Sequence, residues 1–279
     1  MNASIKEQLA KLLESPILAP LQPVLARLET RDFPTLHDLN KLLDLVKPAL
    51  NVQAGHPLRF VPQAKGRMGF ESQYEPRCFL TGEVQTRPDN WHDLFNALVW
   101  LTFPKAKAAI NAQHYQALSA KHDSSTSQRG KVRDTATLLD ESGVFVASAN
   151  PELTKLLLTF QWKELFWHRR EQVRNEMGFY VFGHGLYEKA LKPYTGMTGQ
   201  GLITPVKADF FERCLQEQLS EIDQTLAQYL DSKENCLVPS ELHPIPLLGV
   251  PGLCLDNERA SYYDNTTYFR PGRNLANQM

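Results

Sequence analysis

Histidine, aspartate and asparagine interrupt an otherwise apolar helical pattern in the segment DNWHDLFNALVW, residues 89–100. His92 and Asn96 are four residues apart, so on a helix they lie on one side, one turn from each other. Imidazole and carboxylate groups are common metal ligands, and histidine is the usual general base near neutral pH. The segment therefore predicts a catalytic polar site at His92, Asp93 and Asn96. The alternative is structural: Asp93 helps to cap the helix, and His92 and Asn96 bond to neighbouring loops.

A second predicted helix, residues 105–118, follows after a Phe-Pro break and carries Asn111 and His114. Two successive helices thus each present an asparagine and a histidine at one-turn spacing. We expect His114 to contribute to ligand binding between these helices. The HxxxN spacing is only half of a helical metal site, because it lacks the second histidine and the glutamate of an HExxH motif.

Gly183-His184-Gly185 is the second candidate catalytic position, with Glu188 four residues after the histidine. Two glycines beside a histidine allow the backbone to approach another element or a ligand closely. We predict His184 as a catalytic residue and Glu188 as a ligand-binding one. The alternative is close backbone packing around a hydrogen-bonded histidine.

Two β-prone runs, residues 135–139 and 144–147, flank the sequence Asp-Glu-Ser-Gly at 140–143 and predict an antiparallel hairpin. Asp140 and Glu141 suit a turn without any function. As a pair of carboxylates they could instead bind a divalent ion or act as acid and base. Directly before the hairpin, Asp134 is a candidate catalytic residue and Arg133 a candidate anion-binding one.

The segment at 162–174, WKELFWHRREQVR, combines tryptophans with a basic helix face that includes Arg170 and Arg174. Such a face could hold a phosphate or stack on nucleic-acid bases. It could also be an ordinary amphipathic helix whose aromatic residues pack inward while its arginines pair with nearby glutamates.

Charge and cysteine content narrow the function classes. The 279-residue chain has a net charge of −1, which argues against bulk attraction to nucleic acid or anionic membranes. Its four cysteines are scattered without zinc-site spacing, and no segment resembles a signal peptide or a membrane span, so we expect a cytoplasmic protein. No P-loop, dinucleotide-binding or nucleophile-elbow motif is present, which disfavours those three enzyme classes.

The helical and β-prone patterns together predict an α+β fold that is predominantly α-helical with a small antiparallel β-hairpin or sheet. We expect a single domain, 1–279, with an N-terminal helical layer at 1–48 and a core at 50–273. Within this core we expect a short strand at 77–80, a turn or loop at 194–202, and an irregular Pro/Gly-rich tail from residue 238.

Several blocks of sequence resemble a bacterial family of domains of unknown function, DUF3025. The blocks are NWHDLFNALVWLTFPKAKAAIN, RDTATLLDESGVFV, FGHGLYEKALKPY, and PLLGVPG followed by YYDNTTYFRPGR, between residues 90 and 273. The resemblance implies family membership but supplies no reaction, cofactor or residue role. The polar residues inside the matching blocks are His92, Asp93, Asn96, Arg133, Asp134, Asp140, Glu141, His184, Glu188 and Arg270.

These observations favour an enzyme, most simply a hydrolase, with a metal-dependent reaction as one version. His92 or His184 would be the general base, Asp93 or Asp134 would orient it or bind a metal, and Arg133 or Arg170 would hold an anion. The alternative is a non-catalytic module that binds nucleic acid or a protein partner through the 162–174 helix, with Arg170 and Arg174 as contacts. A small molecule is one candidate ligand, nucleic acid is a candidate that the sequence does not favour, and no membrane contact is expected. The cofactor and the partner stay unassigned. The predicted ligand-binding residues are Arg133, Arg170, Arg174, His114, Glu188 and Arg270.

Overall fold

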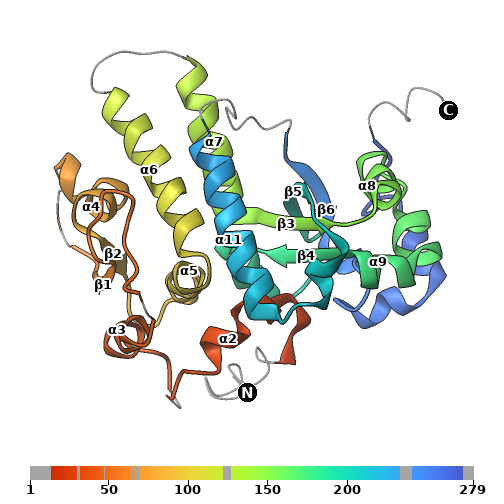
Figure 1. Ribbon diagram of the computed structural model, residues 1–279, viewed down its shortest axis with the longest axis horizontal. Helices are drawn as coiled ribbons and strands as arrows, with labels where there is room; N and C mark the ends of the chain where they lie inside the picture. Colours follow the sequence, from red (N-terminus) through yellow and green to blue (C-terminus); the bar gives the residue numbers. More distant parts are fainter. Residues whose placement is uncertain are drawn as a thin grey trace.

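The computed structural model describes residues 14–29, 32–46, 48–64, 66, 69–121, 127–232 and 241–272, with the backbone alone at 120–121 and 127–133. Helices predominate in this part of the chain (Figure 1). The helices are α2 (Gln22–Leu25), α3 (Leu36–Asp44), α4 (Tyr74–Thr81), α5 (Trp91–Thr102), α6 (Pro104–Lys121), α7 (Ser127–Ser142), α8 (Pro151–Leu158), α9 (Arg170–Glu176), α10 (His184–Ala190) and α11 (Leu215–Asp231). The strands are β1 (Arg59–Pro62), β2 (Glu83–Thr86), β3 (Gly143–Ser148), β4 (Met177–Val181), β5 (Thr198–Pro205) and β6 (His243–Pro246).

A four-stranded mixed sheet has the order β4-β3-β5-β6. Strand β3 pairs antiparallel with β4 and parallel with β5, while β5 pairs antiparallel with β6. Every residue of β3 is buried, as expected of a central strand that is covered on both faces and therefore reads as a continuous apolar run. Strands β1 and β2 form a separate parallel pair. The predicted α+β class with helices predominating is confirmed, but the sheet is mixed.

The predicted hairpin at 135–147 is wrong. Residues 135–139 belong to α7, and the antiparallel partner of β3 is β4, which begins at Met177. Gly143 follows the last residue of α7 and does not form part of a hairpin turn. A side chain at this position would collide with the backbone carbonyl of Leu139, which explains why the residue is glycine. A glycine after a polar residue run is typical of helix ends as well as of hairpin turns, and local sequence does not separate the two.

Two further local predictions are also wrong. Residues 77–80 lie in α4 and not in a strand; the strand of this region is β2, which follows directly after that helix. The predicted loop at 194–202 contains the first half of β5. The glycines of β5 serve packing more than turning, since a Cβ on Gly201 would lie 2.6 Å from the Ile245 side chain of the neighbouring strand.

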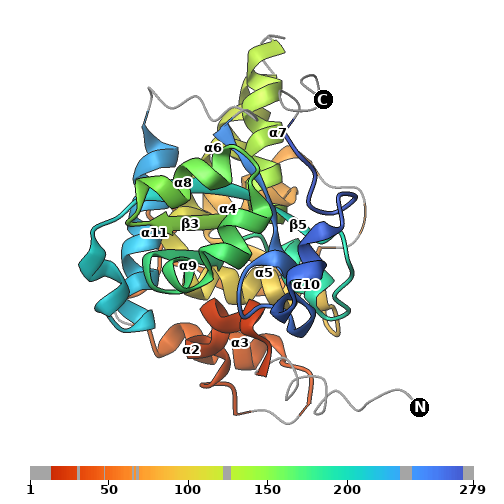
Figure 2. The same cartoon turned by 90° about the vertical axis from the view of Figure 1, so that its right-hand side faces the viewer.

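The long helices α6, α7 and α11 lie to one side of the four-stranded sheet, and α8 and α9 lie to the other (Figures 1 and 2). Helix α11 fixes the start of α6 through a buried carboxylate. Asp223 accepts the backbone N–H groups of Lys105 at 3.2 Å and of Ala106 at 2.9 Å. These two donors have no partner within their own helix, so a side chain from another helix caps them.

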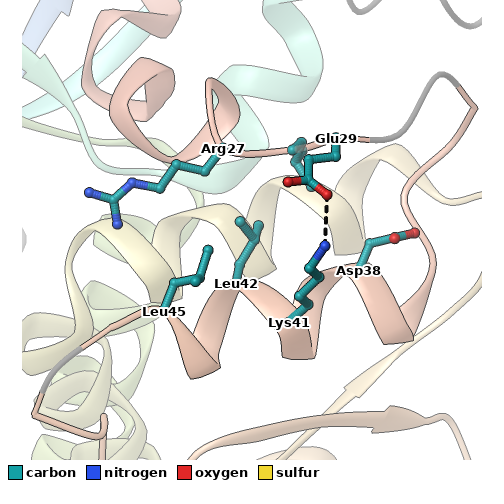
Figure 3. A pocket seen from close by; sticks show the side chains of 7 residues that line it. Arg27, Glu29, Asp38, Lys41, Leu42 and Leu45 are labelled. Carbon is teal, nitrogen blue, oxygen red and sulfur yellow. Dashed lines mark hydrogen bonds and ion pairs between the residues drawn. The ribbon is translucent and has the colours of Figure 1, made fainter.

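At the N-terminal end, α2 and α3 form the described part of the predicted helical layer, and most of the predicted helix at 4–14 lies outside the described residues. Thr35 begins α3 with a capping box that it forms with Asp38. A cavity of about 190 Å³ lies between residues 27–29, which follow α2, and one face of α3. At this cavity Lys41 binds Glu29 at 2.7 Å (Figure 3).

Buried apolar side chains form one cluster that extends from Ile17 to Phe269 and includes residues of both sheets. The described residues from 241 add β6 and short 3₁₀ turns to this cluster. No helix of the described part of the chain is long and apolar enough to cross a membrane. The single-domain organisation stays a prediction.

Candidate functional site

Four segments that are distant in the sequence meet at one polar cavity of about 290 Å³. The start of α5 supplies His92, the start of α10 supplies His184, and the end of α7 supplies Glu141. The first turn of α4 supplies Tyr74 and Glu75. The described residues that line the cavity are Gln63, Tyr74, Glu75, Gln85, Arg87, His92, Asp93, Asn96, Asp140, Glu141 and His184.

The two histidines face each other through their Nε2 atoms, which lie 3.1 Å apart. On the far side of each ring a carboxylate faces Nδ1. Glu188 Oε2 is 3.0 Å from Nδ1 of His92, and Asp140 Oδ2 is 3.7 Å from Nδ1 of His184. The bond to Glu188 favours the proton on Nδ1 of His92, which leaves a lone pair on its Nε2. Nδ1 of His184 makes no hydrogen bond to a described residue. With its proton on Nε2, His184 donates to His92; with its proton on Nδ1, both Nε2 lone pairs are available to one cation.

Glu141 completes a set of three potential metal ligands. Its Oε1 lies 3.6 Å from Nε2 of His184. One ligand atom from each of His92, Glu141 and His184 can be chosen so that all three lie within 4.8 Å of one another. Two nitrogens bound at about 2.1 Å to a tetrahedral zinc ion would lie roughly 3.4 Å apart, close to the observed separation. Among the described residues, this trio is the set that could hold a divalent ion.

The Gly-His-Gly sequence explains how α10 approaches α7 so closely. A Cβ on Gly185 would lie 2.6 Å from Oε2 of Glu141 and 2.9 Å from its backbone oxygen. Gly183 packs in the same way against the backbone at residues 141–143. Glycine at these positions lets the end of one helix contact the beginning of the other, which places His184 beside Glu141.

A buried ion pair lies behind the histidines. Lys107 Nζ on α6 is 2.5 Å from Oδ1 of Asp140, and both side chains are largely buried. Burial opposes charge on Asp140, but Lys107, His184 and His114 together outweigh burial and hold the pKa of this carboxyl below its usual value. Burial, assisted by Lys107, lowers the pKa of His184 to about 4. His184 is therefore neutral at physiological pH, as a metal ligand or a base must be.

Burial also acts on the third member of the trio. It raises the pKa of Glu141, with Asp140 adding to the increase and His92 opposing it. A carboxylate whose charge is disfavoured by its surroundings gains from a nearby cation. The electrostatics of the trio thus suit a metal ion.

Tyr74 and Glu75 of α4 and Asn96 of α5 form a further part of the cavity lining. Asn96 donates from Nδ2 to the Tyr74 hydroxyl at 2.7 Å, and its Oδ1 has no hydrogen-bond partner among the described residues. Asn111 donates to Oε2 of Glu75 at 2.6 Å. Burial raises the pKa of Glu75 to about 7, although the bond from Asn111 works against this shift. Glu75 can therefore both accept and release a proton near neutral pH.

Asp93 lines the cavity but is strongly engaged by Arg87. The guanidinium contacts both carboxylate oxygens, at 2.9 Å from Nε and 2.7 Å from Nη2, and the backbone N–H of Arg87 adds a bond of 2.7 Å. Although burial opposes its charge, these bonds lower the pKa of Asp93. The backbone N–H of Asp93 in turn bonds to the N-cap residue Asn90. This arrangement agrees with the structural alternative for Asp93.

The cavity brings together His92, Asp93, Asn96 and His184 from the predicted catalytic set, and Glu188 adjoins it through His92. His114 is buried on α6 outside the lining residues, where it contributes to the low pKa of Asp140. Asp134 is exposed on α7, and the side chain of Arg133 lies outside the described part of the chain.

The arginines of the predicted binding helix lie elsewhere. Arg170 is buried and donates to the backbone and side-chain oxygens of Asn257, both at 3.0 Å, and to Glu258. Arg174 pairs with Glu171 at 2.9 Å, and Arg270 donates to the backbone oxygen of Thr267. The structure brings none of these three arginines to the histidine cavity.

Sequence reasoning missed Glu75 altogether and considered Glu141 only as a carboxylate pair with Asp140, apart from the histidines. Glu141 lies inside the block RDTATLLDESGVFV that resembles DUF3025. A helix at 135–141, in place of the predicted hairpin, would have allowed Glu141 to be paired with His184. Glu75 carries no comparable signal, because its segment has little periodicity. The one available sign was Pro76, which suits the first turn of a helix.

A second cavity, of about 380 Å³, is lined by residues of the 33–39 segment, by residues 86–89 and by Leu94. Neither this cavity nor the one in Figure 3 contains a set of histidines and carboxylates. The histidine cavity is therefore the candidate site.

A family model described as "Protein of unknown function (DUF3025)" matches residues 58–273, which is most of the chain. The chain belongs to the DUF3025 family. The match includes every element that builds the histidine cavity, from Gln63 after β1 to Glu188 on α10. No curated protein and no solved structure matches this member of DUF3025.

Proposed function

We propose that this protein is a metal-dependent hydrolase whose active site is the histidine cavity. The observation that carries the proposal is the pair of Nε2 atoms 3.1 Å apart, each on a ring whose Nδ1 faces a carboxylate. In metal-bound imidazoles an outer carboxylate commonly fixes the tautomer and the ring orientation. Glu188 makes that bond to His92, and Asp140 lies 3.7 Å from the same atom of His184. We therefore assign His92 and His184, two separate candidate positions in the sequence, to one metal site.

Two histidines and one carboxylate leave coordination positions open, which is typical of catalytic and not of structural metal sites. A divalent ion held by His92, His184 and Glu141 would lower the pKa of a water molecule and polarise a substrate carbonyl or phosphoryl oxygen. His92 is about one-third exposed, so the ligand set borders solvent-accessible space. Water and a small substrate can reach it.

Glu75 is the residue we assign to proton transfer. It lies in the cavity wall and is not one of the three ligands. Its carboxyl group has a pKa of about 7, close to the value at which an acid–base group works best in neutral solution. Asn111 holds one of its oxygens, which fixes the orientation of the group.

A cytoplasmic location fits the proposal, since Cys78, Cys214 and Cys254 are unpaired. The alternative of a binding module at 162–174 gains no support from Arg170, whose guanidinium is engaged inside the protein.

The test is metal content and metal-dependent stability in protein purified without chelator. We expect about one equivalent of a transition metal in the wild type, and loss of it in His92→Ala, His184→Ala and Glu141→Gln. His56→Ala, an exposed histidine on a loop, is the matched control and should keep the metal. Added Zn²⁺ at a hundredfold excess over its Kd should raise the unfolding free energy of the wild type by about 2.7 kcal/mol and should not do so in the ligand variants.

The catalytic part of the proposal needs turnover. Replacing both His92 and His184 by alanine should abolish metal-dependent hydrolysis while the fold is retained. If the wild type binds no metal and the ligand variants differ from it only in stability, the site is structural.

A further inference from the structure

The cavity walls carry an excess of carboxyl groups over cationic side chains. The described lining includes Glu75, Asp93, Asp140 and Glu141, against the single guanidinium of Arg87. That guanidinium already holds both oxygens of Asp93. The nearest buried cation behind the wall, Lys107, is paired with Asp140. A divalent ion would offset these acids without leaving a surplus of positive charge for an anionic substrate.

One side of the cavity presents hydrogen-bond acceptors. Asn96 is 7% exposed; its amide nitrogen donates to the Tyr74 hydroxyl, and its Oδ1 has no partner among the described residues. Next to it, one oxygen of Glu75 is held by Asn111 and no described bond is made to the other. A buried acceptor without a donor costs free energy, so a ligand that brings an N–H group to this wall is favoured over one that does not.

We propose that the cavity binds an uncharged substrate with an N–H group beside the bond that is cleaved, that is, an amide, in preference to a phosphate ester or another anion. This inference rests on the proposed metal-dependent hydrolase and specifies its substrate class. The N–H group donates to Asn96 while the carbonyl oxygen faces the ligand set of His92, Glu141 and His184.

The reaction would be the hydrolysis of the amide. The oxygen of water forms a bond to the carbonyl carbon, and the carbon–nitrogen bond breaks. Glu75 takes one proton from the water and delivers it to the leaving nitrogen, so the products are a carboxylic acid and an amine or ammonia. No oxidant, reductant or further reactant is needed.

The test uses two probes that differ in a single N–H group. Acetohydroxamic acid and N-methylacetohydroxamic acid both chelate a metal through two oxygens, but only the first can donate from nitrogen. Binding is followed by the visible absorption of Co²⁺ in the cobalt-substituted protein, with inorganic phosphate as a tetrahedral oxyanion that lacks an N–H group. We expect acetohydroxamate to bind about tenfold more tightly than its N-methyl analogue and more tightly than phosphate.

Variants at Asn96 connect this preference to the wall. Asn96→Leu removes the acceptor and should bring the two hydroxamates to within about twofold of each other. Asn96→Asp keeps an acceptor, can take a bond from the Tyr74 hydroxyl, and should retain the preference. If Asn96→Leu fails to fold, the wild-type comparison and the aspartate variant still decide the matter.

The outcomes separate the two proposals. Equal affinity of the wild type for both hydroxamates, or tighter binding of phosphate than of acetohydroxamate, overturns the amide inference while the metal site stands. If Co²⁺ does not bind at all, the metal-dependent function fails and the amide inference fails with it.

Discussion

Nδ1 of His92 and Oε2 of Glu188 lie 3.0 Å apart, although the two residues are 96 positions apart in the sequence. The bond links the first turn of α5 to the middle of α10 and determines which nitrogen of His92 faces the cavity. Glu188 is about half exposed, so this carboxylate contributes little to overall stability. Its effect is on the orientation and basicity of the imidazole.

Removing Glu188 should therefore weaken metal binding without unfolding the protein. We expect Glu188→Ala to lower the affinity for Zn²⁺ about 10- to 100-fold, because outer-shell carboxylates commonly contribute that much. Glu188→Gln, which can still accept from Nδ1, should have a smaller effect. Competition with a chromogenic chelator measures both affinities.

The control for this experiment is Glu171→Gln, which changes an exposed glutamate on α9. It should leave the affinity for Zn²⁺ unchanged. An unaltered affinity in Glu188→Ala as well would show that the bond to His92 has no role in binding a metal.

Gly185→Ala tests the contact between α10 and α7. The added methyl group would meet the side chain and the backbone of Glu141, so α10 must move or Glu141 must turn away. We expect a loss of about 1–3 kcal/mol in the free energy of unfolding, as for other overpacked sites, together with weaker metal binding. Denaturant unfolding and chelator competition give the two values.

Gly69→Ala is the matched control, because a Cβ there meets nothing within 4 Å and the backbone φ is −67°. It should leave both quantities within experimental error. Retention of full stability and metal affinity by Gly185→Ala would mean that the close approach is not required.

The parts of the site that follow helical periodicity could be predicted from the sequence, and the parts that depend on helix ends could not. His92 and Asn96 interrupt an apolar helix face, so their unusual residue types were visible in local sequence. His184 was visible through its two flanking glycines. Their convergence depends on tertiary contacts between α5 and α10, and no local pattern contains that information.

The misassigned hairpin shows the same limit in the fold. Residues 135–139 are β-prone, yet α7 continues through them because tertiary packing overrides weak local preference. That error also concealed Glu141, since a turn carboxylate gives no reason to look for a histidine beside it. The pairing of β3 with β5, some 55 residues later, is likewise non-local.

Asp223 should stabilise the start of α6. It accepts two backbone N–H groups at the start of that helix from a buried position on α11. Asp223→Ala removes both acceptors, and we expect a loss of about 1–2 kcal/mol in the free energy of unfolding. Asp231→Ala, at the exposed end of the same helix, should change it by less than about 0.5 kcal/mol. Equal effects of the two substitutions would contradict a capping role for Asp223.

Glu75 should give the stability of the metal-free protein a characteristic pH dependence. Burial raises its pKa from the ordinary value of 4.5 to about 7, so between these pH values the folded protein holds a proton that the unfolded chain has lost. The contribution of Glu75 to stability is thus fully present below about pH 4.5 and is lost as the pH rises through 7. The loss should be on the order of 2–3 kcal/mol.

Glu75→Gln mimics the protonated carboxyl group and removes this dependence. The variant should match the wild type near pH 4 and exceed it in unfolding free energy at pH 8, as measured by denaturant unfolding in the presence of chelator. Glu71→Gln, an exposed glutamate on the neighbouring turn, should show no such divergence. A constant difference between Glu75→Gln and the wild type across this pH range would mean that Glu75 titrates normally, and it would remove the basis for assigning proton transfer to this residue.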